Sequence, residues 1–232
     1  MEKDTYCESK NWQNNPKIIR SFGRIKSRKL SDHKKNLLIN KLKEYQIFDF
    51  AGSQKINHLE IGFGFGDFIF NKANQNPTIN FYGCEPHLNG VVHLLGMLEK
   101  KFLPNLKIIN NDLRLIIDKI PDNFFEKIYI LFPDPWPKSK HFKRRLINTD
   151  FLDNSLARIL TPNGKIIIAT DHDSYKTWIL SNILSSKKFN WLANSKNSWQ
   201  NFPNDWIETK YQKKARAEGR NSILIEIIKY DR

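Results

Sequence analysis

A glycine-rich turn follows a short apolar run near residue 60, in the segment HLEIGFGFGD. Its glycines, Gly62, Gly64 and Gly66, let the chain turn sharply and let a ligand approach the backbone at the start of a helix. The dinucleotide fingerprint G-x-G-x-x-G needs glycine at position 67, where this chain has Asp67. Glu60, two positions before the first glycine, favours a cationic cofactor, and the sulfonium and ammonium groups of S-adenosylmethionine are such cations. A glycine turn without a cofactor is the alternative.

Two more carboxylates stand where the next two apolar runs end. Glu85 follows the run FYGC, 19 residues beyond Gly66, and Asp112 follows two asparagines. In doubly wound folds a carboxylate at the end of the second strand accepts hydrogen bonds from ribose hydroxyls. Asp112 is placed to accept one from an adenine amino group. Either residue alone could be a helix cap, but acidic side chains at three successive strand ends predict a shared cofactor site.

A stiff loop and a basic stretch follow the fourth apolar run. The loop FPDPWP holds three prolines around Asp134 and Trp136, and prolines restrict the backbone. The next eight residues, KSKHFKRR, contain five cations and one aromatic side chain. Because cations are unfavourable in the first turn of a helix, we expect this stretch to bind the phosphates of a nucleic acid. A solvated helix start is the alternative.

Short apolar runs alternate with longer amphipathic segments from residue 56 onward. We expect strands at residues 56–61, 79–83, 106–109, 128–132, 165–169 and 223–228. We expect helices at residues 67–74, 88–102, 113–120, 145–160 and 174–184, and an earlier helix capped by Ser31. This order predicts an α/β fold with a doubly wound, mostly parallel sheet, whose carboxyl edge gathers the residues described above.

The composition indicates a basic globular protein with an amino-terminal arm. The chain has 232 residues, of which 40% are hydrophobic and 27% charged, so it is long enough for one α/β domain. Its net charge of +14 favours a polyanionic partner, although a general solubility role would also explain the charge. We assign residues 1–34 to a basic, flexible arm and residues 35–232 to the folded domain.

The same sequence argues against several classes of protein. No apolar stretch is long enough to span a membrane, and the first residues, MEKDTYCESK, do not have the pattern of a signal or transit peptide. Cys7 and Cys84 are the only cysteines, and no cluster has metal-ligand spacing, so we expect neither a metal nor a disulfide scaffold. We therefore expect a cytoplasmic protein without an obligatory protein partner.

The run FPDPWPKSKHFKRR, with EIGFGFG before it and TKYQ after it, resembles the tRNA (guanine-N7-)-methyltransferase family of the bacterial TrmB type. The resemblance covers residues 56–228 in the same motif order, and FPDPW followed by a basic stretch is highly specific. It implies a class I methyltransferase with a seven-stranded, Rossmann-like sheet. It also implies methyl transfer from S-adenosylmethionine to N7 of guanine 46, in the variable loop of tRNA, giving 7-methylguanosine.

The motifs and the resemblance together assign roles to individual residues. The catalytic residue is expected to be Asp134. Cofactor contacts are expected for Glu60, Gly62, Gly64, Gly66, Glu85, Asp112 and Asp134. Substrate contacts are implied for Lys138, Asp171, Thr209, Lys210, Tyr211 and Gln212. RNA contacts are implied for Lys140, His141, Phe142, Lys143, Arg144 and Arg145. The chain departs from the family pattern where T-K-[FY]-E is TKYQ, so an amide replaces a carboxylate, and where E-V-H is EPH, which keeps the acid.

The implied reaction needs little from the protein besides alignment. Guanine N7 carries a lone pair and no proton, so no strong base must act before attack. Alignment of N7 with the methyl carbon and the sulfur accounts for much of the rate, and the product ring is cationic. We expect Asp134 to orient the guanine and to stabilise the developing charge. A turn or cap aspartate is the alternative, and Asp171 has a similar alternative as an Asx-turn residue.

Three other functions compete with this interpretation. The nearest is a methyltransferase of the same fold that acts on guanine in ribosomal or another RNA. A non-catalytic RNA-binding module is disfavoured by the intact acidic and glycine positions, and a dinucleotide oxidoreductase by the glycine spacing.

A second basic cluster near the carboxyl terminus is expected to face the RNA. It comprises Lys210, Lys213, Lys214, Arg216 and Arg220. The tryptophans Trp191, Trp199 and Trp206 are expected to close the core.

Overall fold

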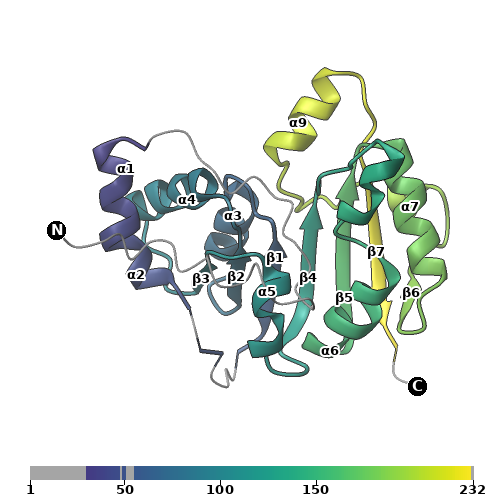
Figure 1. The fold of residues 1–232 in the computed structure, drawn as a ribbon, viewed down its shortest axis with the longest axis horizontal. Coiled ribbons are helices and arrows are strands. Elements are labelled where there is room, and N and C mark those ends of the chain that lie inside the picture. The colour runs from purple at the N-terminus through teal and green to yellow at the C-terminus, as the bar shows by residue number, and fades with distance from the viewer. Residues whose placement is uncertain (1–29, 48, 51–54, 231–232) are drawn as a thin grey trace.

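The computed structural model describes residues 30–47, 49–50 and 55–230. Within this part, seven strands form one sheet in the order β3-β2-β1-β4-β5-β7-β6 (Figure 1). The strands are β1 (Asn57–Ile61), β2 (Asn80–Cys84), β3 (Leu106–Ile109), β4 (Phe125–Leu131), β5 (Leu160–Thr170), β6 (Phe189–Trp191) and β7 (Ile223–Lys229). Strands β1 to β5 are parallel, and β7 is antiparallel to both β5 and β6. The expected doubly wound, mostly parallel sheet is confirmed.

Helices connect the strands and cover the sheet on both faces (Figure 1). Before β1 the chain forms one helical run of α1 (Asp32–Asn36), the π-helix η2 (Leu37–Lys41) and α2 (Leu42–Tyr45). The helices between β1 and β4 are α3 (Asp67–Gln75), α4 (Leu88–Lys100), α5 (Leu113–Ile116) and the 3₁₀ helix η3 (Ile117–Lys119). Those after β4 are η4 (Ser139–Arg144, 3₁₀), η5 (Phe151–Leu156, π), α6 (Ala157–Ile159), α7 (Asp173–Leu184), α8 (Asn197–Gln200) and α9 (Lys210–Ala217).

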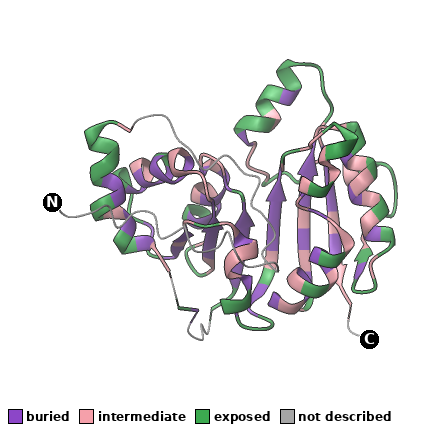
Figure 2. Ribbon diagram, viewed as in Figure 1, coloured by how far each residue is buried: buried purple, intermediate pink, exposed green. Residues whose placement is uncertain are grey.

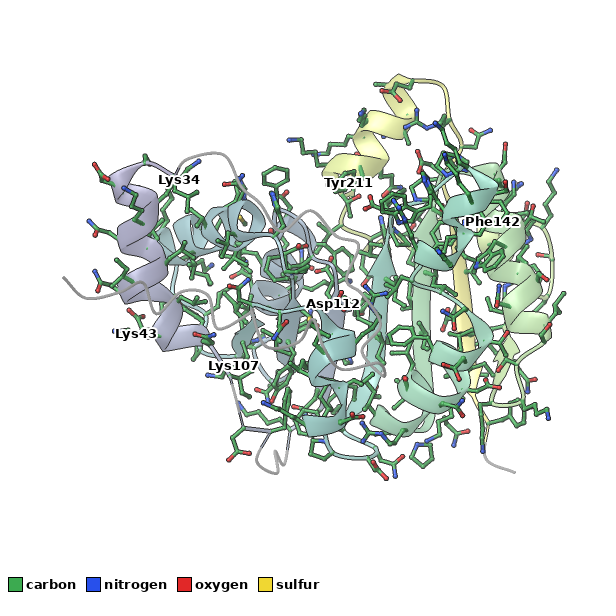
Figure 3. All side chains as sticks on the ribbon, viewed as in Figure 1. Lys34, Lys43, Lys107, Asp112, Phe142 and Tyr211 are labelled. Atoms are coloured by element: carbon green, nitrogen blue, oxygen red, sulfur yellow. The ribbon has the colours of Figure 1, made fainter. Side chains whose placement is uncertain are left out.

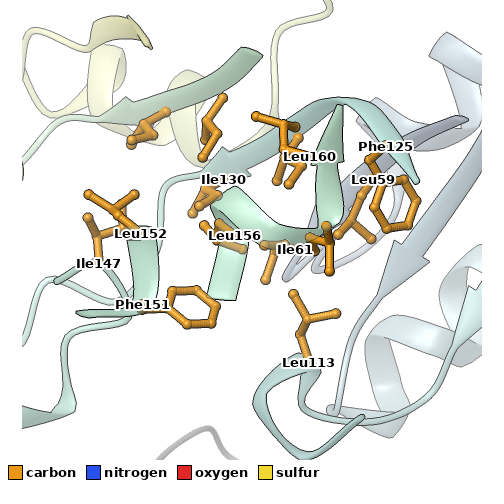
Figure 4. Close-up of a cluster of buried hydrophobic side chains, with 14 of the residues drawn as sticks. Leu59, Ile61, Leu113, Phe125, Ile130, Ile147, Phe151, Leu152, Leu156 and Leu160 are labelled. Atoms are coloured by element: carbon orange, nitrogen blue, oxygen red, sulfur yellow. The ribbon is translucent and has the colours of Figure 1, made fainter. Parts of the chain in front are cut away.

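Alternate side chains of the central strands pack on opposite faces of the sheet. In β4, Ile128 and Ile130 join the larger core cluster with α5, α6 and α7, part of which Figure 4 shows. Tyr129 and Leu131 face the other way and pack with Phe68 of α3. Helices α2, α3 and α4 build a further cluster over β2 and β3. Figure 2 shows that burial is concentrated in the strands and the inner helix faces, so the strand ends sit on a rigid frame.

The helix expected at residues 145–160 was wrong in its first part. The basic stretch forms the short helix η4, which ends at Arg144, and Arg145 has an extended backbone with ψ of 132°. Helical structure resumes at Thr149, where the Asn148 side chain accepts a hydrogen bond from the Phe151 amide, and continues into η5. The elements η4, β6, α8 and α9 were not predicted. Strand β6 has three residues, and α9 has a single buried residue, Ala215, so neither carries a clear apolar period.

The expected amino-terminal arm lies largely outside the described residues, since the description begins at residue 30. Helix α1 begins at Asp32, inside the expected arm, and Leu30 packs against the cluster built by α2 and α4. Ser31 stands at the N-cap position of α1, but its side chain makes no capping hydrogen bond. Among the described residues, no helix combines the length and the apolar character needed to cross a membrane.

Candidate active site

A cavity of about 720 Å³ lies at the carboxyl ends of β1, β2, β3 and β4. The strand order reverses between β1 and β4, and open α/β sheets bind ligands at such a point. The volume falls within the range of small-molecule sites. Asp112 and Tyr211, both labelled in Figure 3, line the cavity from elements that are far apart in the chain. Its walls also include Gly62, Gly64, Glu85, Gly90, Asp134, Trp136 and Arg144.

The glycine turn forms the inner wall of this cavity. Gly62, Gly64 and Gly66 all have positive φ angles, between 57° and 84°, which side chains other than glycine rarely adopt. Gly66 is the N-cap of α3. A further glycine, Gly90 of α4, packs against the turn, and a Cβ atom there would stand 2.1 Å from the Gly64 carbonyl oxygen. The turn therefore depends on glycine both in its own backbone and in the helix that supports it.

Glu85 links the segments that follow β1 and β2, and its expected contact with ribose hydroxyls stays a prediction. Its Oε2 accepts a hydrogen bond from the Gly64 amide and its Oε1 accepts one from the His87 amide, each at 2.8 Å. Burial raises the pKa of Glu85, the two amide hydrogen bonds lower it, and the nearby Asp134 and Asp112 raise it further. An ionised carboxylate has about four acceptor positions, so Glu85 retains acceptor capacity toward the cavity.

Asp112 lines the cavity but its carboxylate has a partner that the sequence did not reveal. It caps α5 by accepting from the Arg114 amide at 3.0 Å. The Arg114 guanidinium also donates to it twice, through Nε at 3.0 Å and through a terminal nitrogen at 2.6 Å. The Asp112 carboxylate therefore caps α5 and also lines the cavity, so the two interpretations do not exclude each other. Its contact with an adenine amino group stays a prediction.

Glu60 does not line the main cavity, and its expected contact with a cationic cofactor stays a prediction. In β1 it pairs with Tyr129 and Gly83 and therefore points to the face covered by α3. It is 3% exposed and lines a separate space of about 20 Å³ between the glycine turn and the start of α9. Burial, with Glu85 adding to it, raises the pKa of Glu60 to about 8, so the neutral acid predominates at pH 7.

The Asp134 loop is held in an uncommon backbone conformation. Among the described residues, four other than glycine have positive φ, and two of these are asparagines, which tolerate it. The other two, Phe132 and Trp136, flank Asp134 with φ of 52° and 42°. The Phe132 amide is fixed by a 2.8 Å hydrogen bond to the Ala169 carbonyl of β5. This loop presents an exposed Asp134 on the cavity wall, where the sequence predicted the catalytic carboxylate.

The basic stretch contains two kinds of residue: its lysines are exposed, whereas its arginines contact the Asp134 loop. Lys138, Lys140 and Lys143 are exposed and do not line the cavity. Arg144 lines the cavity, with its guanidinium 4.9 Å from the ring centre of Trp136. The His141 ring meets the same tryptophan edge-on at 5.7 Å. The lysines thus have the exposure that phosphate contacts require, and their contact with RNA stays a prediction.

Arg145 has a different position from the one expected for an RNA contact. Its residue is 2% exposed, and the guanidinium lies 3.9 Å from the ring centre of Phe142, whose own side chain is half-buried. It donates to the Pro135 carbonyl and to Ser174, so its hydrogen-bonding groups turn inward. The assignment of Arg145 to the RNA-facing residues is therefore corrected, because a buried guanidinium with interior partners cannot reach a phosphate outside.

The segment Thr209–Gln212 packs against the glycine turn through Tyr211 and Lys210. Thr209 caps α9 by accepting from the Gln212 amide at 3.1 Å. The Tyr211 ring lies over Gly64, and the Lys210 ammonium stands 4.3 Å from the ring centre of Phe65. The Gln212 side chain accepts a 2.7 Å hydrogen bond from the Trp206 indole. The amide that replaces the family's carboxylate therefore fixes the approach to α9 and does not line the cavity.

Two further expected residues have structural partners at this edge of the sheet. Asp171, which follows β5, forms a 2.7 Å ion pair with Arg220. In the second basic cluster, Arg216 pairs with Glu208 at 2.8 Å. Trp191 and Trp199 pack against the larger core cluster, while Trp206 packs with Phe68, as expected for core residues. Sequence analysis missed two wall residues, Arg114 and Gly90, which belong to no motif, and gave no role to Trp136 although it lies in the FPDPW motif.

Comparison with known proteins relates these features to a family. Residues 54–225 match the sequence profile of a family described as "Putative methyltransferase". A Hyphomonas neptunium protein named tRNA (guanine-N(7)-)-methyltransferase is 37% identical over 206 residues, which are 84% of this chain and 93% of that protein. A Rhizobium meliloti protein of the same name is 40% identical, with 72% of each chain covered.

Solved structures share the fold at low sequence identity. The 16S rRNA methyltransferase KamB matches with a TM-score of 0.51 at 14% identity, covering 88% of this chain and 96% of that one. A Streptococcus mutans protein solved in complex with SAH matches with a TM-score of 0.50 at 13% identity, covering 76% of this chain and 90% of that one. The similarity confirms a class I methyltransferase fold.

Proposed function

The chain belongs to the tRNA (guanine-N7-)-methyltransferase family, and from this premise we propose that it transfers a methyl group from S-adenosylmethionine to N7 of a guanine in tRNA. The product is 7-methylguanosine, and by resemblance the target is guanine 46 in the variable loop. One observation carries the proposal. A single cavity brings together the glycine turn, Glu85 and Asp134, and exposed lysines follow Asp134 closely in the chain.

The residues of the cavity fit S-adenosylmethionine. The positive φ angles of the glycine turn expose backbone at the start of α3, where a ligand can approach closely. Glu85 retains acceptor positions for the ribose hydroxyls, and Asp112 stands at the end of β3 for the adenine. When bound, S-adenosylmethionine supplies a methyl group on a positively charged sulfur. Glu60 lies next to the glycine turn, in the small space that also borders the start of α9.

We propose that Asp134 acts in the chemical step, which its exposed position on the cavity wall supports. The lone pair of guanine N7 forms the new bond to the methyl carbon while the carbon–sulfur bond breaks, and the purine becomes cationic. A carboxylate on the cavity wall stabilises this charge as it develops. The strained residues on either side, Phe132 and Trp136, fix its direction before the guanine arrives.

The tRNA would bind along the edge where the cavity opens. The exposed residues Lys138, Lys140 and Lys143 follow the Asp134 loop in the chain, and α9 with Lys210, Lys213 and Lys214 lies above the ends of β4 and β5 (Figure 1). Phosphate contacts from such residues make binding strongly dependent on salt. We place the protein in the cytoplasm, which the proposed tRNA substrate and the free, buried Cys84 thiol support.

The proposal is tested with tRNA that lacks 7-methylguanosine. The protein is incubated with this tRNA and labelled S-adenosylmethionine, and the nucleosides are analysed after digestion. We expect labelled 7-methylguanosine at one position of the variable loop, and none with ribosomal RNA. Label in another base atom would contradict the proposed reaction, and label in ribosomal RNA alone would contradict the proposed substrate.

A further inference from the structure

Arg145 adds a side-chain link between the Asp134 loop and α7. Its Nε donates to the Pro135 carbonyl at 2.9 Å, directly beside Asp134 in the chain. Its terminal nitrogens donate to the Ser174 carbonyl at 3.3 Å and to the Ser174 hydroxyl at 3.1 Å. Ser174 belongs to the first turn of α7. The guanidinium therefore joins the loop after β4 to the helix after β5.

The guanidinium is also enclosed by aromatic rings. Its carbon lies 3.9 Å from the ring centre of Phe142 and 5.1 Å from those of Tyr175 and Trp178. Two of these rings are fixed in turn by the backbone of Ile147, whose amide donates to the Tyr175 hydroxyl and whose carbonyl accepts from the Trp178 indole. Ile147 is fully buried. The enclosure thus has a rigid wall, and the guanidinium has one orientation in it.

Only arginine suits this place. A planar guanidinium stacks on rings and donates in several directions within one plane, whereas a lysine ammonium is a compact charge without a stacking face. The loop it reaches needs such support, because Phe132 and Trp136 hold strained backbone angles. Ala169 fixes the loop at Phe132, and Arg145 fixes it at Pro135. Asp134 lies between these two fixed points.

We propose that Arg145 is a positioning residue for methyl transfer, which holds the Asp134 loop in its reactive direction and takes no part in binding RNA. The inference rests on the proposed function, since it concerns the residue that acts on the guanine. Misplacement of a reacting group by about 1 Å can cost about 10²-fold in rate. Loss of the guanidinium should therefore slow the chemical step while leaving both ligands bound.

The test compares three substitutions in the full-length protein. Arg145→Lys keeps the positive charge but removes the planar group that stacks on the rings and donates to both Pro135 and Ser174. Lys143→Ala removes an exposed cation two residues earlier. Arg158→Lys is the matched control, because Arg158 also donates to backbone carbonyls, those of Ile117 and Ile120, but at the edge of the sheet away from the cavity. Each protein is assayed for single-turnover methyl transfer, tRNA affinity across a salt series, S-adenosylmethionine affinity and melting temperature.

We expect Arg145→Lys to slow methyl transfer by about 10-fold to 100-fold, with both affinities and the salt dependence of tRNA binding unchanged. Lys143→Ala should show the opposite pattern, with weaker tRNA binding and a flatter salt dependence. Arg158→Lys should lower the melting temperature without slowing transfer. If Arg145→Lys does not fold, Ser174→Ala, which removes one of the three acceptors, should slow transfer by about threefold to tenfold, as loss of one hydrogen bond would.

The outcomes separate this inference from the proposed function. Parent protein that does not methylate tRNA would contradict the proposed function itself. An active parent with an Arg145→Lys variant that transfers at the parent rate, or that binds tRNA more weakly than the parent does, would overturn the positioning role. Equal loss of rate in Arg145→Lys and Arg158→Lys at equal melting temperatures would overturn it too, because the effect would then be general destabilisation.

Discussion

Two walls of the same cavity are built in different ways. The glycine turn reaches its shape with residues that adopt positive φ without a steric penalty, and Glu85 then fixes it through the Gly64 amide. The Asp134 loop reaches its shape with Phe132 and Trp136, each at positive φ and at a cost of about 1–3 kcal/mol. Contacts from β5 and Arg145 hold that loop from outside.

This difference separates binding from chemistry. The glycine wall takes its backbone angles from local residue types, so changes away from its direct contacts, Glu85 and Gly90, should leave it intact. The aspartate wall takes its conformation from tertiary contacts, so distant substitutions should disturb it. We therefore expect changes at the glycine wall to alter cofactor affinity, and changes at the aspartate wall to alter turnover.

Asp134→Asn should have the largest effect. It removes the charge that stabilises the purine as it becomes cationic, and loss of one such electrostatic contact costs about 10²–10³ in kcat. The S-adenosylmethionine affinity and the melting temperature should match the parent. Steady-state kinetics with calorimetry of cofactor binding checks this. Asp122→Asn is the control, because Asp122 forms an exposed ion pair with Arg158 away from the cavity, and its loss should leave turnover intact. Parent-like turnover in Asp134→Asn would contradict the assigned role.

Gly90→Ala should have the next largest effect, this time on the glycine wall. The new Cβ would meet the Gly64 carbonyl oxygen at 2.1 Å, so the turn or α4 must move. Such overpacking costs about 1–3 kcal/mol, and we expect weaker S-adenosylmethionine binding with it. Gly96→Ala in the same helix is the matched control, since its Cβ would meet only Leu37, at 4.0 Å. That control should keep the parent affinity. If the two variants bound S-adenosylmethionine equally well, the glycine wall would not control cofactor binding as we expect.

The contrast also explains what the sequence could predict. The strand ends and the glycine turn follow from apolar runs and from glycine spacing, and both lie where they were expected, apart from small shifts at the ends. Arg145 could not be placed in this way, because it closes a run of cations and nothing local marks it as buried. Its partner Ser174 is 29 residues further along, so only the folded chain shows the contact.

Glu60 shows a second limit of sequence reasoning. Its position before the first glycine predicts a side chain that faces the cofactor. In the structure the side chain lies on the face of the sheet that α3 covers. Asp112 shows a third limit, since its neighbour Arg114 is close in sequence and still gave no signal of an ion pair. For both residues the sequence indicated that a carboxylate lies near the site, but it did not indicate which way the side chain points.

Glu60→Gln should change how stability depends on pH. The pKa of Glu60 is about 8 in the folded protein against 4.5 as its ordinary value, so the folded state binds the proton more tightly. The stability that this proton contributes is complete below pH 4.5 and is lost as pH rises through 8. The parent should therefore lose about 1 kcal/mol between pH 6 and pH 7 from this group, and Glu60→Gln should not. Denaturant unfolding at the two pH values measures the difference, and identical pH slopes would show that Glu60 is ionised in the folded state.

Lys143→Ala should have the smallest effect, and it sharpens the comparison by lying on neither wall. Lys143 is exposed, so its loss should not alter the cavity, the melting temperature or cofactor binding. If it contacts one phosphate, the slope of log affinity for tRNA against log salt falls by about 0.9. Lys119→Ala removes the same charge from an exposed site just before β4, at the opposite edge of the sheet. Filter binding over a salt series separates the two, because a change in net charge alone affects both variants equally, whereas a phosphate contact affects Lys143→Ala only.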